Sequence, residues 1–238
     1  MPTAKLIRRE QCNDSTHLLT FRPTETFEFI GGQFIIIDSG LKNEEGKNYK
    51  RTYSLLSSDD KTDEFQIAYK ALEKGIVTNQ YLNHLQVDDV ITFSGPWGKF
   101  LKDEDFFGEG DVFVLATDTA LASALSFVNS KKLKQKENVS FYWMVSDKDY
   151  FLDFEMVQKR IPPGLAHFEI VPIAEYGSEG RDEVLHKAKS IANQHHNPRT
   201  ALLAGDGIIV NKVKEYLIEK GVNENHIGTE VYFNKDSV

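Results

Sequence analysis

The sequence has few residues that could cross-link the fold, and it has no long apolar runs. One cysteine, Cys12, occurs among 238 residues, so no internal disulfide forms and no cluster held by four thiolates fits within the chain. No stretch approaches the roughly 20 apolar residues that cross a bilayer, and the first residues lack the apolar core of a secretory signal. We therefore expect no membrane span and a cytoplasmic location.

Positive charge is also in deficit. The chain carries 28 Lys and Arg against 36 Asp and Glu, which gives a net charge of -8. Because nucleic-acid binding depends on clustered basic residues, we expect no nucleic-acid partner. The pair His195 and His196 has no third ligand at metal spacing, so we expect no metal site.

The composition is that of a globular protein, with 40% hydrophobic and 11% aromatic residues. Short segments rich in β-branched and aromatic residues, separated by turns, predict an antiparallel barrel or sandwich in the first hundred residues. The expected strands cover residues 18–22, 33–38, 51–55, 64–71 and 89–94.

From residue 111 the pattern changes to strands alternating with helices, which predicts a doubly wound, mostly parallel sheet. The acidic, glycine-containing stretch 102–110 separates the two patterns. We therefore predict two domains, residues 1–105 and 106–238. The expected strands of the second domain are 112–116, 139–145, 168–173, 200–204 and 230–233, and the expected helices are 119–130, 149–160, 182–194 and 208–220.

Arg51, Thr52, Tyr53 and Ser54 place a cation, an aromatic ring and a hydroxyl on one predicted strand. Side chains alternate along a strand, so Arg51 and Tyr53 share a face. There a guanidinium can bind phosphate oxygens while a phenol ring stacks on a flat heterocycle. The four residues alone also fit an ordinary exposed strand.

Two glycine motifs follow. Gly75 precedes Val77 and Thr78 at a predicted helix start, where backbone N–H groups and a hydroxyl can bind an anion; a simple capped helix is the alternative. Residues 95–100, from Gly95 to Phe100, form a tight turn at the end of the strand-rich half.

In this order, ahead of an α/β half, the three motifs resemble the ferredoxin-NADP reductase family of flavoproteins, over nearly the whole chain. The resemblance implies an N-terminal antiparallel β-barrel that binds FAD, followed by a parallel-sheet nucleotide-binding domain. It implies that Arg51 holds the pyrophosphate, that Tyr53 stacks on the isoalloxazine and that Ser54 faces N5. The remaining residues implied to bind the cofactor are Thr52, Tyr69, Lys70, Gly75, Val77 and Thr78.

The end of the chain is similar to the closing segment of that family. By this resemblance Glu230 is a candidate for proton transfer, and Tyr232, or else Phe233, is the ring that covers the flavin. Ser54, Glu230 and Tyr232 are thus the expected catalytic residues. An ordinary edge strand is the alternative interpretation of residues 229–233.

The nucleotide half departs from the family. Where the family has Gly-Thr-Gly-Ile-Ala-Pro, this chain has Asp118, Thr119, Ala120, Leu121, Ala122 and Ser123. A Cβ at position 120 and a carboxylate at position 118 both oppose the approach of a phosphate. We hypothesise that Asp118 caps the following helix in place of that phosphate.

Further differences point the same way. Ser146 and Glu175 stand where the family has arginines that meet a 2′-phosphate, and the segment Ala204, Gly205, Asp206 lacks the family's cysteine. NAD(P)H, the donor that the resemblance implies, is therefore in question, and NADPH most of all.

Three functions follow from the sequence. The resemblance implies an FAD-dependent oxidoreductase that transfers electrons between NAD(P)H and a separate one-electron carrier, a ferredoxin or flavodoxin, through flavin N5. The altered nucleotide half favours an FAD-bound electron-transfer protein or subunit that no longer binds nicotinamide. The third possibility is a non-catalytic flavin-binding module.

Overall fold

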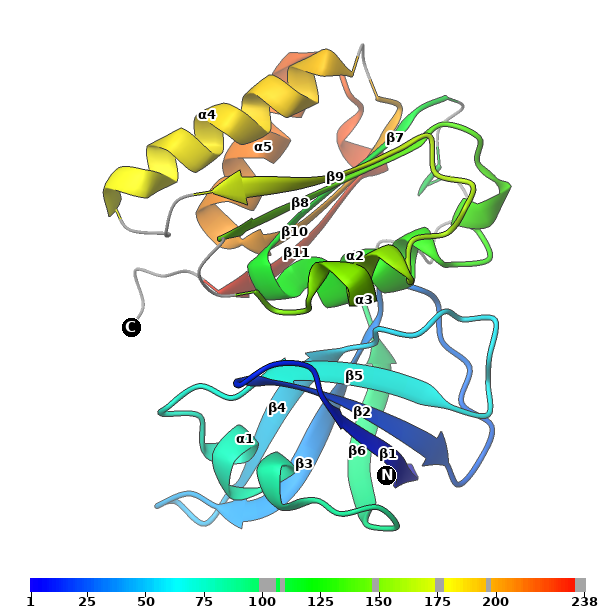
Figure 1. Ribbon diagram of the computed structural model, residues 1–238, viewed down its shortest axis with the longest axis vertical. Helices are drawn as coiled ribbons and strands as arrows, with labels where there is room; N and C mark the ends of the chain where they lie inside the picture. Colours follow the sequence, from blue (N-terminus) through cyan, green and yellow to red (C-terminus); the bar gives the residue numbers. More distant parts are fainter. Residues whose placement is uncertain (99–105, 108–109, 147–149, 174–177, 196–197, 234–238) are drawn as a thin grey trace.

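The computed structural model describes residues 1–98, 106–107, 110–146, 150–173, 178–195 and 198–233, without the side chains of 178–180 and 233. A strand-rich N-terminal half lies against an α/β C-terminal half (Figure 1). This arrangement confirms the predicted fold class. The predicted boundary at residue 105 lies outside the described residues, so the domain limits stay a prediction.

The N-terminal half is a curled antiparallel sheet with the strand order β4-β3-β6-β1-β2-β5. An isolated bridge between Leu55 and Ile67 joins its two edges and closes the sheet into a barrel. The strands are β1 (Thr3–Gln11), β2 (Thr16–Pro23), β3 (Phe34–Lys42), β4 (Asn48–Ser54), β5 (Phe65–Lys70) and β6 (Val90–Trp97).

Strand β1 is absent from the sequence-based expectation. Only Ala4 and Leu6 of its nine residues are buried, and most of the others are charged or polar. Its apolar alternation is therefore too short to detect. It pairs with both β2 and β6 and so occupies the middle of the sheet.

Phenylalanine rings fill the barrel. Phe65 lies 5.4 Å from Phe21 and from Phe93, and Phe27 lies 5.2 Å from both Phe65 and Phe93 between ring centroids. These separations suit edge-to-face and offset packing. The packed interior fixes the strands whose ends carry the predicted site.

The C-terminal half is a five-stranded parallel sheet with the order β11-β10-β7-β8-β9. Helices α4 and α5 cover one face, and α2 and α3 lie on the side toward the barrel (Figure 1). The chain order changes direction between β7 and β10, which is the switch point of the sheet. The elements are β7 (Val112–Thr117), α2 (Leu121–Val128), β8 (Val139–Ser146), α3 (Phe154–Gln158), β9 (His167–Ile173), α4 (Ser178–Gln194), β10 (Thr200–Asp206), α5 (Gly207–Glu219) and β11 (Ile227–Phe233).

Helix α2 joins the two halves, and all eight of its residues are buried. A Cβ on Gly31 would lie 2.3 Å from the Ser126 carbonyl oxygen, so this barrel loop passes directly over the helix backbone. Ser126 Oγ accepts from Gly32 N–H at 3.2 Å and donates to the Ser57 carbonyl at 2.8 Å. The helix is thereby fixed against the barrel.

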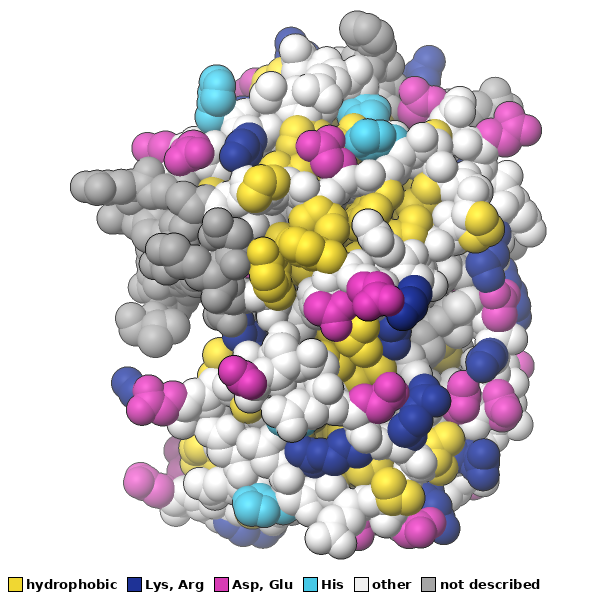
Figure 2. Space-filling model, in the orientation of Figure 1, with side chains coloured by type: hydrophobic (Ala, Val, Ile, Leu, Met, Phe, Trp, Pro, Cys, Tyr) yellow, Lys and Arg dark blue, Asp and Glu magenta, His cyan; other side chains and the backbone are white. Residues whose placement is uncertain are grey.

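The surface toward β9 and α3 is apolar in part, as Figure 2 shows above the junction of the two halves. Tyr150 and Phe154 pack edge to face at 4.4 Å, and Phe154 is 38% exposed.

No helix in the described part of the chain is long and apolar enough to cross a membrane. The predicted cytoplasmic location stays a prediction.

Candidate functional site

Four polar side chains from three elements meet where the barrel touches the parallel sheet. Ser54 ends β4, Ser123 lies in α2, and Glu230 and Tyr232 lie on β11. Ser54 Oγ donates to Glu230 Oε1 at 3.2 Å, Ser123 Oγ donates to Glu230 Oε2, and the Tyr232 hydroxyl donates to Ser54 Oγ. The structure thus brings together the three residues expected to be catalytic and adds Ser123.

Burial sets the proton affinity of this group. It raises the pKa of Glu230 to about 7, against hydrogen bonds from Ser123 and Ser54 that favour the ionised form. Burial and the Glu230 charge raise the pKa of Tyr232 well above its ordinary value. Near neutral pH, Glu230 can therefore take up or release a proton, while Tyr232 stays protonated.

Arg51 and Tyr53, which are expected to bind the pyrophosphate and the flavin ring, lie just before Ser54 on β4. Tyr53 is 7% exposed, and its hydroxyl lies near Thr78 but forms no hydrogen bond of normal geometry with a described residue. Burial raises the pKa of Tyr53 to about 12, while Thr78 and the positive charge of Arg51 oppose this rise. Arg51 itself is exposed, as is its neighbour Thr52.

An unpaired buried hydroxyl costs about 1 to 3 kcal/mol. The Tyr53 hydroxyl, which lies near Thr78 and is influenced by the Arg51 charge, therefore needs an acceptor that the described chain does not supply with normal hydrogen-bond geometry. A flavin dinucleotide carries phosphate and ribityl oxygens that meet this need. The residues present fit the cofactor that the sequence predicts.

Helix α1 (Ile76–Gln80) follows Gly75, and no side chain caps its start. A Cβ on Gly75 would lie 3.2 Å from the Leu72 carbonyl oxygen and 3.5 Å from Thr78 Oγ1, so glycine keeps the turn close to Thr78. Val77 is buried in the barrel cluster. Its side chain thus packs inward, so the predicted contact of Val77 with the cofactor would be made by its backbone.

Tyr69 and Lys70 end β5. The Tyr69 hydroxyl donates to Asn83 Oδ1 at 2.9 Å and accepts from Arg9 at 3.3 Å, inside the barrel. Its ring lies edge-on to Tyr53, with 6.5 Å between centroids. Tyr69 therefore supports the position of Tyr53, and direct contact with the cofactor stays a prediction for Tyr69 and for Lys70, which is half-buried.

Thr117, Gly205 and Asp206 pack against one another at the switch point of the parallel sheet. The Asp206 backbone N–H donates to Thr117 Oγ1 at 2.9 Å, and a Cβ on Gly205 would lie 1.9 Å from that oxygen. Gly205, with a φ of +130°, is therefore required by Thr117 whether or not a ligand binds.

The expected internal cap lies at a different position. Asp118 is in the 3₁₀ turn Asp118–Ala120 (η3), and neither this turn nor α2 has a side-chain cap. Instead Asp206 caps α5, accepting from Ile208 and Ile209 N–H at 3.0 and 3.2 Å. Asp206 is fully buried, so an internal carboxylate occupies a helix start beside the switch point.

Asp118, which stands where the family motif has its first glycine, has a φ of +51°. This left-handed conformation costs a residue with a Cβ about 1 kcal/mol or more. Trp143, fully buried in β8, donates its indole N–H to the Asp118 carbonyl at 3.0 Å. Ser146 ends β8 and is buried, whereas position 175 lies outside the described residues.

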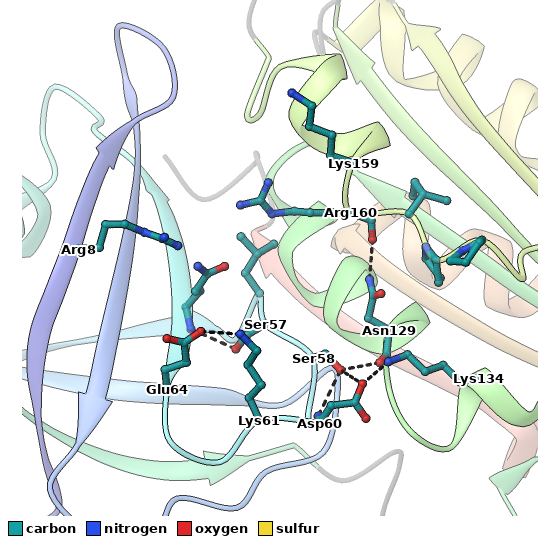
Figure 3. Close-up of a pocket in the computed structure, with 15 residues that line it drawn as sticks. Arg8, Ser57, Ser58, Asp60, Lys61, Glu64, Asn129, Lys134, Lys159 and Arg160 are labelled. Carbon is teal, nitrogen blue, oxygen red and sulfur yellow. Dashed lines mark hydrogen bonds and ion pairs between the residues drawn. The ribbon is translucent and has the colours of Figure 1, made fainter.

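A cavity of about 560 Å³ lies elsewhere on the junction, and none of the predicted site residues lines it. Figure 3 shows lysines and arginines around it. Arg8 pairs with Glu10, Lys61 with Glu64, Lys134 with Asp60 and Lys159 with Glu155. These local pairs neutralise most of its positive charge.

The sequence motifs did not predict a functional role for two residues, Ser123 and Asp206. Ser123 was visible only as a departure from a family motif, because its partner Glu230 is 107 residues away. Asp206 follows an apolar strand and precedes Gly207 at a helix start. An acidic residue in that place is a recognisable capping pattern.

Comparisons with known proteins agree with this geometry. Residues 3–101 match the oxidoreductase FAD-binding domain family. NADH-cytochrome b5 reductase 1 of Mycosarcoma maydis is 25% identical over 158 residues, which cover 64% of this chain and 47% of that protein. Its counterpart in Laccaria bicolor is 24% identical over 157 residues, covering 63% and 49%. The chain therefore spans about half the length of the curated relatives it matches.

Solved structures share the fold. The siderophore interacting protein of Acinetobacter baumannii superposes with a TM-score of 0.75 at 19% identity, covering 100% of this chain and 91% of the other. Ferredoxin-NADP+ reductase of Plasmodium falciparum gives 0.71 at 21% identity, covering 97% and 96%. The barrel and the parallel sheet are thus arranged as in two-domain flavoproteins.

The N-terminal half is accordingly an FAD-binding oxidoreductase domain. With its parallel-sheet partner, it forms the two-domain fold of ferredoxin-NADP reductase-like flavoproteins. The family resemblance inferred from the motifs is confirmed, and so is FAD as the cofactor. The roles of individual site residues stay predictions.

Proposed function

We propose that the chain is an FAD-dependent oxidoreductase that transfers electrons through flavin N5 between a nicotinamide nucleotide and a separate one-electron carrier protein. The observation that carries this proposal is the junction where Ser54, Ser123 and Tyr232 surround Glu230 beside the FAD-binding strand. The names of the similar proteins support a ferredoxin or a cytochrome as carrier. A flavodoxin is the other carrier that the family resemblance implies.

FAD, when bound, exchanges a hydride for single electrons at N5. The chain's own residues bind the cofactor, orient it and exchange protons with it. Arg51 offers a guanidinium to the pyrophosphate, the Tyr53 hydroxyl finds the acceptor it lacks, and Thr78 lies beside it. Ser54 would face the edge of the flavin ring, and Tyr232 would cover the ring.

Glu230 is the group that moves a proton. Because its pKa is about 7, Glu230 can both take up and release a proton near neutral pH. Ser54 donates to one carboxyl oxygen and so connects Glu230 to the end of β4. The bonds from Ser54 and Ser123 hold the carboxyl group between β4 and α2.

A second function keeps FAD and the carrier but excludes the nicotinamide nucleotide. It is favoured by the switch point, where Asp206 caps α5 from within and Asp118 and Ala120 replace glycines. A phosphate that approaches Asp118 meets a carboxylate. In this case the flavin receives its electrons from a reduced protein.

Anaerobic mixing of the FAD-loaded protein with NADH, with NADPH and with a reduced ferredoxin or flavodoxin distinguishes the two functions. The primary proposal predicts that one nicotinamide bleaches the flavin absorbance within seconds and that oxidised carrier restores it. Bleaching by reduced carrier alone supports the second function. A flavin that none of these reduces would overturn both.

A further inference from the structure

Ser123 is this chain's own addition to the junction. In the resembled motif its position belongs to proline, which has no hydroxyl. Here the side chain is fully buried in the first turn of α2, between the barrel loop at Gly32 and strand β11. A buried hydroxyl in such a place requires partners.

Two acceptors lie within reach of the Ser123 hydroxyl. One is Glu230 Oε2, and the other is the Gly32 carbonyl oxygen at 3.3 Å. A serine hydroxyl has one proton and can also accept. It therefore donates to one of these oxygens at a time, and the protonation state of Glu230 decides which one.

We propose that Ser123 is a positioning residue for proton transfer by Glu230. When Glu230 is ionised, Ser123 donates to Oε2. When Glu230 is protonated, the carboxyl O–H donates to Ser123 Oγ, and Ser123 donates to the Gly32 carbonyl. The hydroxyl rotates without gaining or losing a proton, so Ser123 and Glu230 stay hydrogen-bonded to each other in both states.

Few titratable groups among the described residues face Glu230, so its proton uptake can be related to its hydroxyl contacts. On β4 and α2 the facing groups are the uncharged hydroxyls of Ser54 and Ser123. On β10 the position paired with Glu230 is Ala204. Tyr232 on β11 is the titratable group that interacts with it among the described residues. The hydroxyl contacts and burial therefore dominate its titration.

The inference rests on the proposed role of Glu230, but its test does not require turnover. Glutamate labelled with ¹³C in the carboxyl group allows Glu230 to be titrated by NMR in the cofactor-free protein, with Glu230→Gln assigning the signal. Ser123→Ala removes the donor to the ionised form, so we expect the midpoint to rise by about one pH unit. Ser123→Thr, which keeps a hydroxyl, restores it.

Ser126→Ala is the matched control, because Ser126 lies on the same helix but bonds to Ser57 and Gly32 instead. We expect it to leave the Glu230 midpoint unchanged. In the FAD-loaded protein, the pH profile of flavin reduction should shift with Ser123→Ala by the same unit, with FAD affinity unaltered.

An unchanged midpoint in Ser123→Ala, or an equal shift in Ser126→Ala, would overturn the inference. Either result leaves the proposed function standing, because that function is tested by flavin reduction. Conversely, a flavin that nothing reduces would overturn the function while the titration still reports on Ser123.

Discussion

The barrel site and the switch point of the parallel sheet differ in how their polar groups are satisfied. At the barrel, Arg51 is exposed and the buried Tyr53 hydroxyl lacks a partner in the described chain. At the switch point, Thr117 accepts from Asp206, while Asp206 caps α5 through Oδ1 and pairs with Arg181 through Oδ2 at 3.8 Å. The barrel therefore leaves the Arg51 guanidinium and the Tyr53 hydroxyl available to bind FAD. In the nucleotide half, by contrast, the Asp206 carboxylate occupies a helix start that a phosphate could otherwise bind.

The largest expected effect tests whether the switch point is packed against itself. Gly205→Ala places a Cβ 1.9 Å from Thr117 Oγ1 at a φ of +130°. We expect a loss of about 3 to 5 kcal/mol in the free energy of unfolding, from overpacking and backbone strain together. Urea denaturation measures it.

Gly164→Ala is the control, because a Cβ there meets nothing within 4 Å and its φ is not positive. Its effect should stay within about 0.5 kcal/mol. A Gly205→Ala variant as stable as this control would show that the glycine is free to serve a ligand.

The next effect concerns Glu230 and pH. Below pH 4.5 the carboxyl is protonated in the folded and unfolded protein alike. Between pH 4.5 and 7 the unfolded chain loses this proton and the folded protein keeps it, so stability falls as pH rises. Above pH 7 the free energy of unfolding falls no further, and the total decrease is up to about 3 kcal/mol.

Glu230→Gln removes this dependence, so the cofactor-free variant should be more stable than the parent at pH 8 and similar to it at pH 4. Thermal unfolding across this range measures the difference. The exposed Glu219→Gln should keep the parent's profile. Parallel profiles for the parent and Glu230→Gln would mean that Glu230 is not buried as described.

Arg51→Ala tests the barrel region directly. Loss of a charge-assisted contact with phosphate should weaken FAD binding by about 10- to 100-fold, or roughly 1.5 to 3 kcal/mol. Fluorescence titration of the cofactor-free protein gives the affinity. Arg22→Ala removes an exposed arginine of β2 and should change nothing; equal losses in both variants would point to general electrostatics.

The smallest effect concerns the strained turn. Asp118→Gly relieves a φ of +51° and should stabilise the protein by about 1 kcal/mol. It also removes a carboxylate from the path of a phosphate, so affinity for NAD(P)H should rise. Asp88, with a φ of 80°, is the matched control.

Asp88→Gly relieves the same kind of strain far along the chain, next to its ion-pair partner Lys5. It should affect stability alone. A rise in nucleotide affinity in both variants, or in neither, would remove Asp118 from the account of the nucleotide half.

The sequence predicts the fold where patterns are local. Apolar alternation and loop spacing reveal five barrel strands and the βα units, but β1 is missed because charged residues interrupt its alternation. The helix expected over 149–160 is shorter, Phe154–Gln158, because Asp153 caps its start by accepting from Met156 N–H.

The site is predictable only as far as motifs reach. Ser54, Glu230 and Tyr232 come from family motifs, and the structure joins them across 176 residues of sequence. Ser123 has no motif of its own, since its role follows from packing α2 between two domains. The position of the internal cap depends on which strand end faces which helix, so Asp118 was expected where Asp206 serves.

One measurement tests the contrast between the two regions most directly. The cofactor-free protein is titrated by calorimetry with FAD, and then the FAD-loaded protein is titrated with NADH. We expect one FAD per chain, bound at least about 100-fold more tightly than NADH, a difference of roughly 2.7 kcal/mol. Binding of NADH as tight as that of FAD, or no binding of FAD at all, would contradict this expectation.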